Sequence, residues 1–511
     1  MRFSINSFKR LSSMGYEPIY HQIRRKIPRL TQCQWQRPAL SGLLALTLCA
    51  CASAPPAMDT AVAFKVPENW QDDSGVASGV ASPLARWWLQ FDDFLLGELI
   101  AQSLDANTGI KAAKAVLAQA RALRDVASAG LWPTLGSSAS AGRSRSDNQS
   151  SAHFQLGLDA SWELDVLGAN RSAVRAAQAS ADASNASLGA VQVSIAAEVA
   201  LDYIALRHAQ ARMAIAQANL SSQQETHQLT RWRLQAGLVT DLEAEQANAA
   251  AQQTAAQIPV LQTTIEQTSH TLAVLTGQAP AALVRRLAIP GPLPQAADTL
   301  AWALPADTLR QRSDVRAAEF QVFAAAARVT QARAARWPSF KLGGSLGLGA
   351  LTLGALTDGA SLAAAVLASV AWPVLDGGAG LAQQDAQMAA LDHASATYQA
   401  TLLTALTEVE DALLALRSDR ARLTSLQLAY RSAETAASLA SQRYGSGLVD
   451  FQTVLETQRT RLSTQDSLAS ARAAVSIDHV RLYKALGGGW QPEITDSAIP
   501  AATNPLREPP S

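Results

Sequence analysis

Apolar and polar positions alternate with a period of two in part of the first half of the chain. From Phe154 to Asp165 every even-numbered residue is apolar and every odd-numbered residue is polar or glycine. Such alternation predicts a β-strand with one apolar and one polar face. A later region repeats the pattern over two further predicted strands, whose apolar positions are Phe340, Leu342, Leu346 and Leu348, then Leu362, Val366, Val370 and Trp372.

Four tryptophans lie near the ends of the predicted strands: Trp132, Trp162, Trp337 and Trp372. The aromatic girdles of membrane β-barrels occupy such positions. A strand of a soluble sandwich would alternate equally well, and this alternative stays open. An open four-stranded sheet in a bilayer has edges that lipid cannot hydrogen-bond, so the membrane interpretation requires closure by several copies of the chain.

A different period, with apolar residues every three or four positions among small ones, predicts very long helices. Residues 168–236 form a helical stretch of 69 residues, which would extend about 100 Å. A returning helix runs from Asp241 to Leu275, and the later half repeats both helices from Leu381 to Tyr444 and from Phe451 to Leu486. A coiled-coil scaffold is the simpler interpretation, but it does not account for strands between the helices.

The two halves of the chain correspond to each other at a nearly fixed offset. Leu131-Trp132-Pro133 recurs as Arg336-Trp337-Pro338. Three further features recur 210 residues apart, namely Trp162 with Trp372, Gly237-Leu238-Val239 with Gly447-Leu448-Val449, and Leu275-Thr276-Gly277 with Ala485-Leu486-Gly487. We therefore predict one module used twice: helix, two strands, very long helix, glycine turn, helix.

These patterns divide the chain into six predicted parts. Residues 1–50 are a signal peptide and 51–84 an acylated N-terminal extension. Residues 85–277 and 299–487 are the two repeats, and the Pro-rich segment 278–298 links them. Residues 488–511 form a flexible C-terminal tail.

Composition narrows the class of protein. The chain has 511 residues, of which 16% are charged and 5% aromatic, with 42 basic and 42 acidic side chains. This composition argues against intrinsic disorder and against a nucleic-acid partner. Residues 1–50 hold eight of the basic side chains and one acid, so the remainder has a net charge of about −7.

The leader ends in a candidate lipid-attachment site. An apolar run from Ala39 to Ala50 has the length of a signal-peptide core and is too short to span a membrane. It ends in Leu48-Cys49-Ala50-Cys51, which resembles a bacterial lipobox with Cys51 as the acylated residue. An ordinary secretory cut near Ala52 or Ala54 stays open, as does a translation start downstream of Met1. Loss of Cys33 and Cys49 would leave one cysteine and no disulfide.

No catalytic or metal motif has the sequence context that its chemistry needs. Gly343-Gly344-Ser345-Leu346-Gly347 matches a nucleophile elbow, which requires a strand, a turn and a helix, but a strand pattern continues after it. The seven histidines include no pair at i, i+3 or i, i+4, so helical metal pairing is absent. We expect no enzyme activity, no metal site and no cofactor other than the covalent lipid on Cys51.

The turns after the two long helices carry the remaining candidate residues. Each has a glycine after a helix, Gly237 or Gly447, and an acid near the start of the next helix, Asp241 or Asp450. Helix capping alone accounts for these four residues. It does not account for the identical apolar pairs, which are expected to be exposed and to dock a partner: Leu238 with Val239, and Leu448 with Val449.

Five segments together resemble the outer-membrane efflux protein family, the TolC/OprM-like channels, and within it the acylated NodT-type branch. The resemblance covers nearly the whole chain after the leader. The segments are Trp88-Leu89-Gln90-Phe91-Asp92-Asp93 leading to Leu99–Asn107, Trp162–Gly168, the two Gly-Leu-Val turns, Arg312–Glu319 and Ala332–Ser339.

The resemblance implies a mainly α fold with a small β part. Long α-hairpins would form a periplasmic α-barrel, and four strands from each of three chains would form a twelve-stranded outer-membrane β-barrel. The implied partners are two further copies, a periplasmic adaptor of the membrane fusion type, an inner-membrane pump of the resistance-nodulation-division type, and outer-membrane lipid. The implied cellular location is the outer membrane, with the α-barrel extending into the periplasm.

Several residues match positions of a gate in that family. Tyr444 matches a tyrosine that braces the closed state, with Glu243 at the matching position of the neighbouring turn. Glu456 falls where the family usually has aspartate in a ring of carboxylates, and Arg459 matches a common partner one turn on. Asp241 and Asp450 are further candidates for this ring. Some members have another ring acid where this chain has Thr453, which implies a lower cation affinity.

We therefore interpret the chain as the outer-membrane channel of a tripartite efflux pump, without catalysis of its own. An exit channel for type I protein secretion, which uses the same fold, is an alternative within transport. A non-conducting structural lipoprotein of the envelope is an alternative from another class. For Glu456 and Arg459 the alternative to a gate role is a solvated surface pair that contributes little.

Overall fold

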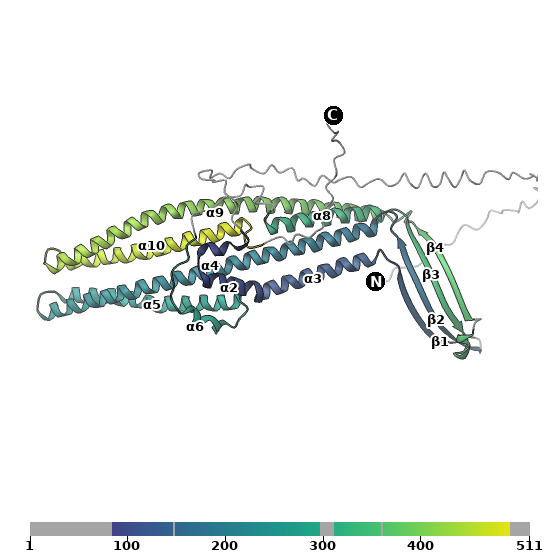
Figure 1. The fold of residues 1–511 in the computed structure, drawn as a ribbon, viewed down its shortest axis with the longest axis horizontal. Coiled ribbons are helices and arrows are strands. Elements are labelled where there is room, and N and C mark those ends of the chain that lie inside the picture. The colour runs from purple at the N-terminus through teal and green to yellow at the C-terminus, as the bar shows by residue number, and fades with distance from the viewer. Residues whose placement is uncertain (1–83, 147–148, 297–310, 359–360, 491–511) are drawn as a thin grey trace, which may run out of the picture. The chain divides into compact units, whose positions relative to one another are not determined.

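A computed structural model describes residues 84–146, 149–296, 311–358 and 361–490. The predicted leader, Cys51 and most of the predicted tail lie outside these residues. The described part forms two equivalent modules, as the sequence repeat predicts (Figure 1). The first contains α3 Thr108–Ala129, β1 Thr134–Ser146, β2 Gln149–Leu164, α4 Ala169–Gln235 and α5 Asp241–Leu275; the second contains α8 Ser313–Ala334, β3 Ser339–Ala350, β4 Leu362–Ala371, α9 Ala379–Gly445 and α10 Phe451–Ala485.

Shorter elements precede and separate the modules. The 3-10 helix η1 Leu84–Phe91 and helix α2 Phe94–Ala106 come before the first module. Two turns of helix, η2 Pro280–Leu283 and α6 Val284–Leu287, lie inside the segment predicted as a linker. A third short turn, η3 Gly354–Thr357, joins β3 to β4. The predicted domain boundaries themselves stay a prediction.

The periodicity of the sequence located the long helices within a few residues. Helices α4 and α9 each have 67 residues, and α5 and α10 each have 35. Each 67-residue helix follows a glycine with positive φ, Gly168 at 79° or Gly378 at 90°. Residues with a side chain rarely adopt this backbone conformation, so glycine is suited to the position where the chain changes from strand to helix. The inclusion of Trp372 in a strand was wrong by one residue, since β4 ends at Ala371 and Pro373 cannot continue a ladder.

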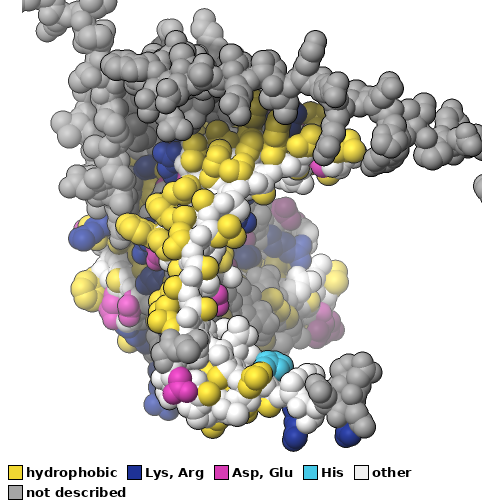
Figure 2. All heavy atoms as spheres, turned by 90° about the vertical axis from the view of Figure 1, so that its right-hand side faces the viewer, with side chains coloured by type: hydrophobic (Ala, Val, Ile, Leu, Met, Phe, Trp, Pro, Cys, Tyr) yellow, Lys and Arg dark blue, Asp and Glu magenta, His cyan; other side chains and the backbone are white. Residues whose placement is uncertain are grey.

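The four strands form one antiparallel sheet in the order β1-β2-β3-β4. The register aligns Leu158 with Leu346 and Trp162 with Leu342, so the even-numbered positions of β2 and β3 share a face. Leu346 in turn aligns with Ala364 of β4, which extends this apolar face across a third strand. Figure 2 views the molecule from the side of the sheet, and hydrophobic side chains gather in a band there. The predicted alternation is therefore confirmed.

The opposite face of the sheet is polar or small. Asp159 aligns with Ser345, and Ser345 aligns with Ala365. Lys341 forms an ion pair with Glu163 at 3.5 Å on this face. The two outer strands pair on one side only within the described chain, and all ten residues of β4 are exposed. The sheet therefore has an uncovered apolar face and two free edges.

The helices pack in a continuous series. Helix α3 contacts α4, α4 contacts α8, and α8 contacts α9, while α4 pairs with α5 and α9 pairs with α10 (Figure 1). By length and composition α4 is the helix in the described ranges that could cross a membrane, but 44% of its most apolar window is buried inside the molecule. Its contacts with α3, α5, α8 and α10 account for this apolar character.

The main hydrophobic core lies where the ends of the shorter helices meet the middle of the long ones. Trp87 of η1 is fully buried and stacks on Tyr483 of α10, with ring centroids 5.3 Å apart. The Tyr483 hydroxyl donates a hydrogen bond to Gln90. Burial raises the pKa of Tyr483 to about 12. Leu99 of α2, Leu272 of α5 and Leu416 of α9 belong to the same cluster.

Equivalent positions close both modules by different chemistry. The Asn107 side chain donates to the carbonyl of Leu275 at 2.8 Å, and the Arg312 guanidinium donates to the carbonyl of Ala485 at 2.8 Å. The two carbonyls are 210 residues apart, at the ends of α5 and α10. Each donor stands directly before the first helix of its module. Both contacts connect the start of a module to its end.

A buried polar network fixes the middle of α4. The Tyr203 hydroxyl donates to Asp93 at 2.9 Å and accepts from Arg207. Arg207 also donates to the carbonyl of Ile289 at 2.7 Å, which attaches the segment after α6 to α4. Burial raises the pKa of Tyr203 to about 12, so its hydroxyl stays protonated as a donor at neutral pH.

Candidate functional site

The candidate site comprises the first tip, residues 236–240, the second tip, residues 446–450, and the helices that lead to them. Both tips have the same turn. Gly237 and Gly447 have φ values of 72° and 71°. The Leu238 amide donates to the carbonyl of Arg233 at 2.8 Å, and the Leu448 amide donates to that of Arg443 at 2.9 Å. This pairing is a Schellman motif, which requires a left-handed residue at the glycine position.

The start of the returning helix differs between the two tips. Asp450 caps α10, because its carboxylate accepts from the Thr453 amide at 2.9 Å. Hydrogen bonds from the Thr453 hydroxyl and amide lower the pKa of Asp450. The expectation that Asp241 caps α5 is wrong, since Thr240 occupies the cap and makes no side-chain capping bond. Asp241 is instead exposed in the first turn of α5, where its negative charge interacts favourably with the helix dipole.

Only one residue of each apolar pair at the tips is exposed to solvent. Leu238 is 73% exposed and Leu448 is 74% exposed. Val239 and Val449 are half-buried, so the expectation that both members of each pair are exposed is wrong for the valines. Each tip therefore presents one exposed leucine at its end, next to a valine that is half-buried.

Tyr444 lies at the end of α9 and contacts both hairpins. Its ring lies 5.7 Å from that of Phe451, and the Arg233 guanidinium of α4 lies 4.5 Å from its centroid. A cation over a tyrosine face is attracted by the ring electrons, by roughly 0.5–2 kcal/mol. The Tyr444 hydroxyl is buried without a hydrogen-bond partner in the described chain. The ring, rather than the hydroxyl, connects the two hairpins here.

The other predicted gate residues lie near the tips on returning helices. Glu456 and Arg459 are both exposed on α10, and no ion pair joins them within the part of the chain described. Glu243 is half-buried in the first turn of α5. The solvated surface pair is therefore not formed in this structure, which leaves the Glu456 carboxylate exposed to solvent.

A row of polar contacts between α4 and α10 was not found from the sequence. We call it the polar seam. Arg212 forms an ion pair with Asp466 at 2.6 Å. Further toward the tips, Asn219 accepts from Arg461 at 3.0 Å, and Thr226 accepts from Gln458 at 3.5 Å.

The spacing of the seam residues on α4 is regular. The three seam residues Arg212, Asn219 and Thr226 follow one another at seven-residue intervals, and Arg233, which contacts Tyr444 of α9, continues the series. Seven residues complete about two turns of helix, so all four lie on one face. This heptad was the available signal in the sequence. The partners could not be found, because they lie more than 200 residues away along the chain.

His208 lies at the end of the polar seam that is farther from the tips. Its Nε2 lies 3.3 Å from the Ser470 hydroxyl. Burial lowers the pKa of His208, and the Arg212 cation lowers it further against the opposing effect of Asp466. His208 is therefore neutral at pH 7, and the seam relies on the Arg212–Asp466 ion pair for charge attraction.

The four tryptophans form two equivalent pairs at one end of the sheet. Trp162 donates to the carbonyl of Leu131 at 3.0 Å, and Trp372 donates to that of Arg336 at 3.3 Å. Each acceptor directly precedes the other tryptophan of its pair, Trp132 or Trp337, which are 72% and 60% exposed. Each pair therefore combines an exposed ring, Trp132 or Trp337, with a ring whose indole N–H is satisfied, Trp162 or Trp372, and such amphipathic side chains suit a membrane interface.

Two candidate chemical features lack the arrangement they need in the described residues. Ser345 lies within β3, with strand on both sides, and so lacks the turn that a nucleophile elbow needs. No group of three metal-ligating side chains gathers in the described ranges.

Comparison with known proteins identifies the class of channel. The sequence profile of the family described as "Outer membrane efflux protein" matches residues 99–278 and 304–488. The chain is 32% identical to the pyoverdine export outer membrane protein OpmQ of Pseudomonas aeruginosa over 87% of this chain and 95% of that protein. It is 30% identical to nodulation protein T of Rhizobium leguminosarum bv. viciae, over 83% of this chain and 88% of that protein.

A solved structure is also similar. The outer-membrane channel OprN matches with a TM-score of 0.78 and 35% sequence identity, over 84% of this chain and 99% of that chain. The agreement extends over both modules, so the fold and the sequence point to the same family.

The Tyr444 contact predicts a difference between two substitutions. Tyr444→Phe keeps the ring and loses a hydroxyl that has no partner, so the tips should stay as protected as in the unmodified protein. Tyr444→Ala removes both ring contacts and should speed tryptic cleavage at Arg443 by at least about threefold, since even 0.65 kcal/mol of local opening has this effect. Limited proteolysis with mass spectrometry measures the rate. Equal rates for the two variants would contradict a role for the ring.

Proposed function

Because the chain belongs to the outer membrane efflux protein family, we propose that three copies form one channel that a periplasmic adaptor connects to an inner-membrane pump. The protein is an outer-membrane component of an efflux pump and extends into the periplasm. The family is one of channels and not of enzymes. We propose accordingly that the chain has no catalytic step and no cofactor beyond a covalent lipid.

The unclosed sheet is the observation that carries the trimer proposal. One chain supplies four strands, an uncovered apolar face and two free edges. Lipid can cover the face but cannot satisfy the hydrogen bonds of the edges. Joining β4 of one chain to β1 of the next around a three-fold axis satisfies every edge and gives a barrel of twelve strands.

We propose that the tips close the periplasmic end of this channel. With about 100 Å of helix between sheet and tip, the tips lie far beyond the membrane. Three copies of Glu456 would bring carboxylates together near the axis, where they repel one another. Tyr444 and Arg459 are the proposed groups that hold the closed state, with Glu243, Asp241 and Asp450 as further acids at the entrance.

We propose that the two tips also bind the adaptor. Leu238 and Leu448 are large apolar side chains exposed at the ends of hairpins, where no core of the same chain can cover them. Gly237, Gly447, Val239 and Val449 give both turns the same shape, so the adaptor would meet two similar sites on each chain. The pump is proposed to be of the resistance-nodulation-division type.

The lipid on Cys51 is a proposal with its own test. Radioactive palmitate should label the protein, and Cys51→Ala should abolish labelling while trimers still form, because the barrel has its own apolar band. Gel fluorography measures the label. Label retained by the Cys51→Ala protein would contradict the assignment.

Planar-bilayer recording tests the channel and the Glu456 ring together. The purified protein should give discrete conductance steps, and Glu456→Gln should lower the preference for cations, because it removes three charges from a constriction. Glu266→Gln serves as a matched control, since it removes the same charge from an exposed position of α5 that lies far from the tips. An unmodified protein without conductance would contradict the channel, and unchanged selectivity in Glu456→Gln would place the ring elsewhere.

Replacing the exposed leucines tests docking. Leu448→Asp should abolish drug resistance in a strain that depends on this pump, because a charge at an apolar contact costs several kcal/mol to desolvate. The trimer and its level in the outer membrane should stay normal. The control is Leu428→Asp at an exposed position of α9, about five helical turns from the tip. Normal resistance in the Leu448→Asp strain would contradict the proposed role of this residue in docking.

A further inference from the structure

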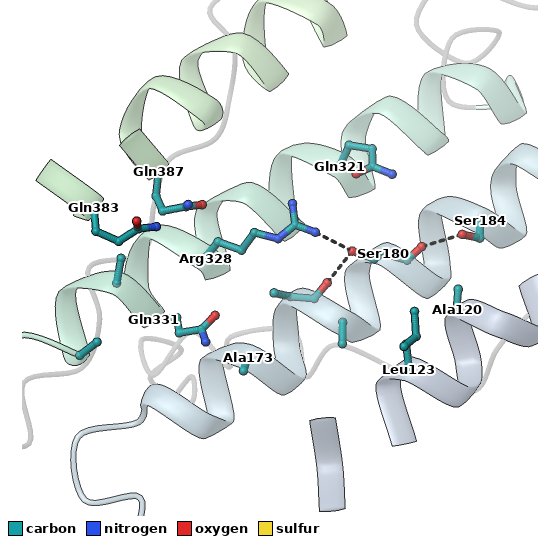
Figure 3. Close-up of a pocket in the computed structure, with 14 residues that line it drawn as sticks. Ala120, Leu123, Ala173, Ser180, Ser184, Gln321, Arg328, Gln331, Gln383 and Gln387 are labelled. Atoms are coloured by element: carbon teal, nitrogen blue, oxygen red, sulfur yellow. Dashed lines mark hydrogen bonds between the residues drawn. The ribbon is translucent and has the colours of Figure 1, made fainter. Parts of the chain in front are cut away.

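A hollow in the wall of helices has a distinctive lining. It has a volume of about 660 Å³ and is lined from four helices, α3, α4, α8 and α9. Figure 3 shows side chains from these helices directed into it, with the Arg328 side chain reaching toward Ser180. Most of the lining is small or uncharged polar, and Arg328 is the charged residue among the described residues that line it.

The hollow lies on the concave side of the wall. The four helices contact in the order α3, α4, α8, α9, so they form a single layer. Both Leu123 from the first helix and Gln383 from the last line the same hollow. The first and last members of a layer can border one hollow only on the side toward which the layer curves. When three such walls close into a barrel, this side faces the lumen.

Charges on the four helices are distributed unequally between the two sides. Asp182 of α4 and Asp385 of α9 follow the lining residues Ser180 and Gln383 by two positions, and Arg333 of α8 follows Arg328 by five. At about 100° per residue they lie about 140° to 200° around their helices, away from the hollow. Arg124 of α3 is neutralised by an ion pair with Asp125 at 2.7 Å. Arg328 is therefore the charged side chain that lines the hollow itself, and no ion pair compensates it within the described ranges.

Arg328 is available to a solute. The residue is exposed, its guanidinium donates one hydrogen bond to the Ser180 hydroxyl at 3.3 Å, and no carboxylate pairs with it within the described ranges. The other polar groups around it are the neutral amides of Gln331, Gln383 and Gln387, which donate and accept hydrogen bonds. An unpaired guanidinium among amides binds carboxylate, phosphate or sulfonate groups in preference to cations.

We propose that Arg328 and the surrounding glutamines form a station in the channel lumen for anionic solutes, so that exported substrates carrying carboxylate or similar acidic groups are held there in transit. This inference rests on the proposed trimeric channel, which brings three copies of Arg328 to one level. Basic rings select anions in other pores by the same physical effect. The station is opposite in sign to the carboxylates proposed for the tips.

Citrate block of single channels tests the station. Citrate is a trivalent anion, and it is added on the side of the β-barrel so that it reaches the lumen without passing the tips. It should reduce the current of the unmodified channel, and Arg328→Gln should raise the half-blocking concentration about tenfold, since three charges are removed from one level. The anion-to-cation permeability ratio in a KCl gradient should fall in the same variant.

Two matched variants separate charge from structure. Arg328→Lys keeps the charge and should retain most of the block, whereas Arg333→Gln removes a charge from the other side of α8 and should behave like the unmodified protein. Block and selectivity unchanged in Arg328→Gln, in channels that conduct normally, would overturn the station and leave the proposed channel intact. Block lost equally in Arg328→Lys would also overturn it, because a merely structural contact would then account for the effect. A complete lack of conductance in the unmodified protein would instead overturn the proposed channel.

Discussion

A sheet with two unpaired edges and one apolar face constrains everything else in this molecule. Exposure of the apolar face to water is unfavourable, and lipid cannot form hydrogen bonds with the strand edges. Neither water nor lipid alone therefore accommodates the sheet of an isolated chain. Closure around an axis removes the edges and turns the polar face inward. In the proposed trimer the same axis would place the helix walls around a common space, because each strand pair continues directly into the helices of its own module.

Duplication supplies the two hairpins that this closure needs, and the copies have kept their geometry more strictly than their chemistry. The tip glycines, the paired tryptophans and the lengths of the long helices agree closely between modules. The side chains that act at equivalent points differ, as with Thr240 and Asp450 at the helix caps. Two of the proposed gate residues, Tyr444 and Glu456, belong to the second module and have Leu234 and Gln246 at the equivalent positions of the first.

Most of the fold could be predicted because it is encoded locally. Alternation fixed the strand faces, and the glycines at 237 and 447 fixed where the long helices end, since a left-handed turn there requires no distant contact. The polar seam could not be predicted, because a heptad on α4 does not say which helix meets it. Arg328 was missed for a similar reason: its freedom from a carboxylate partner depends on how four helices turn their faces, which single-helix patterns do not reveal.

The two contacts that close the modules differ in how acid affects them. Asn107 carries no titratable group, whereas Arg312 also binds Asp314 and Glu408 at 2.7 Å each. Burial acts to raise the pKa of Asp314, but the Arg312 guanidinium holds it below its ordinary value. A carboxyl group with a lowered pKa stabilises the folded state above its unfolded pKa, and this contribution disappears as the pH falls through the lowered value. Acidification therefore weakens the contact that closes the second module and leaves the corresponding Asn107 contact of the first module unchanged, so two equivalent joints of one scaffold respond differently to protons.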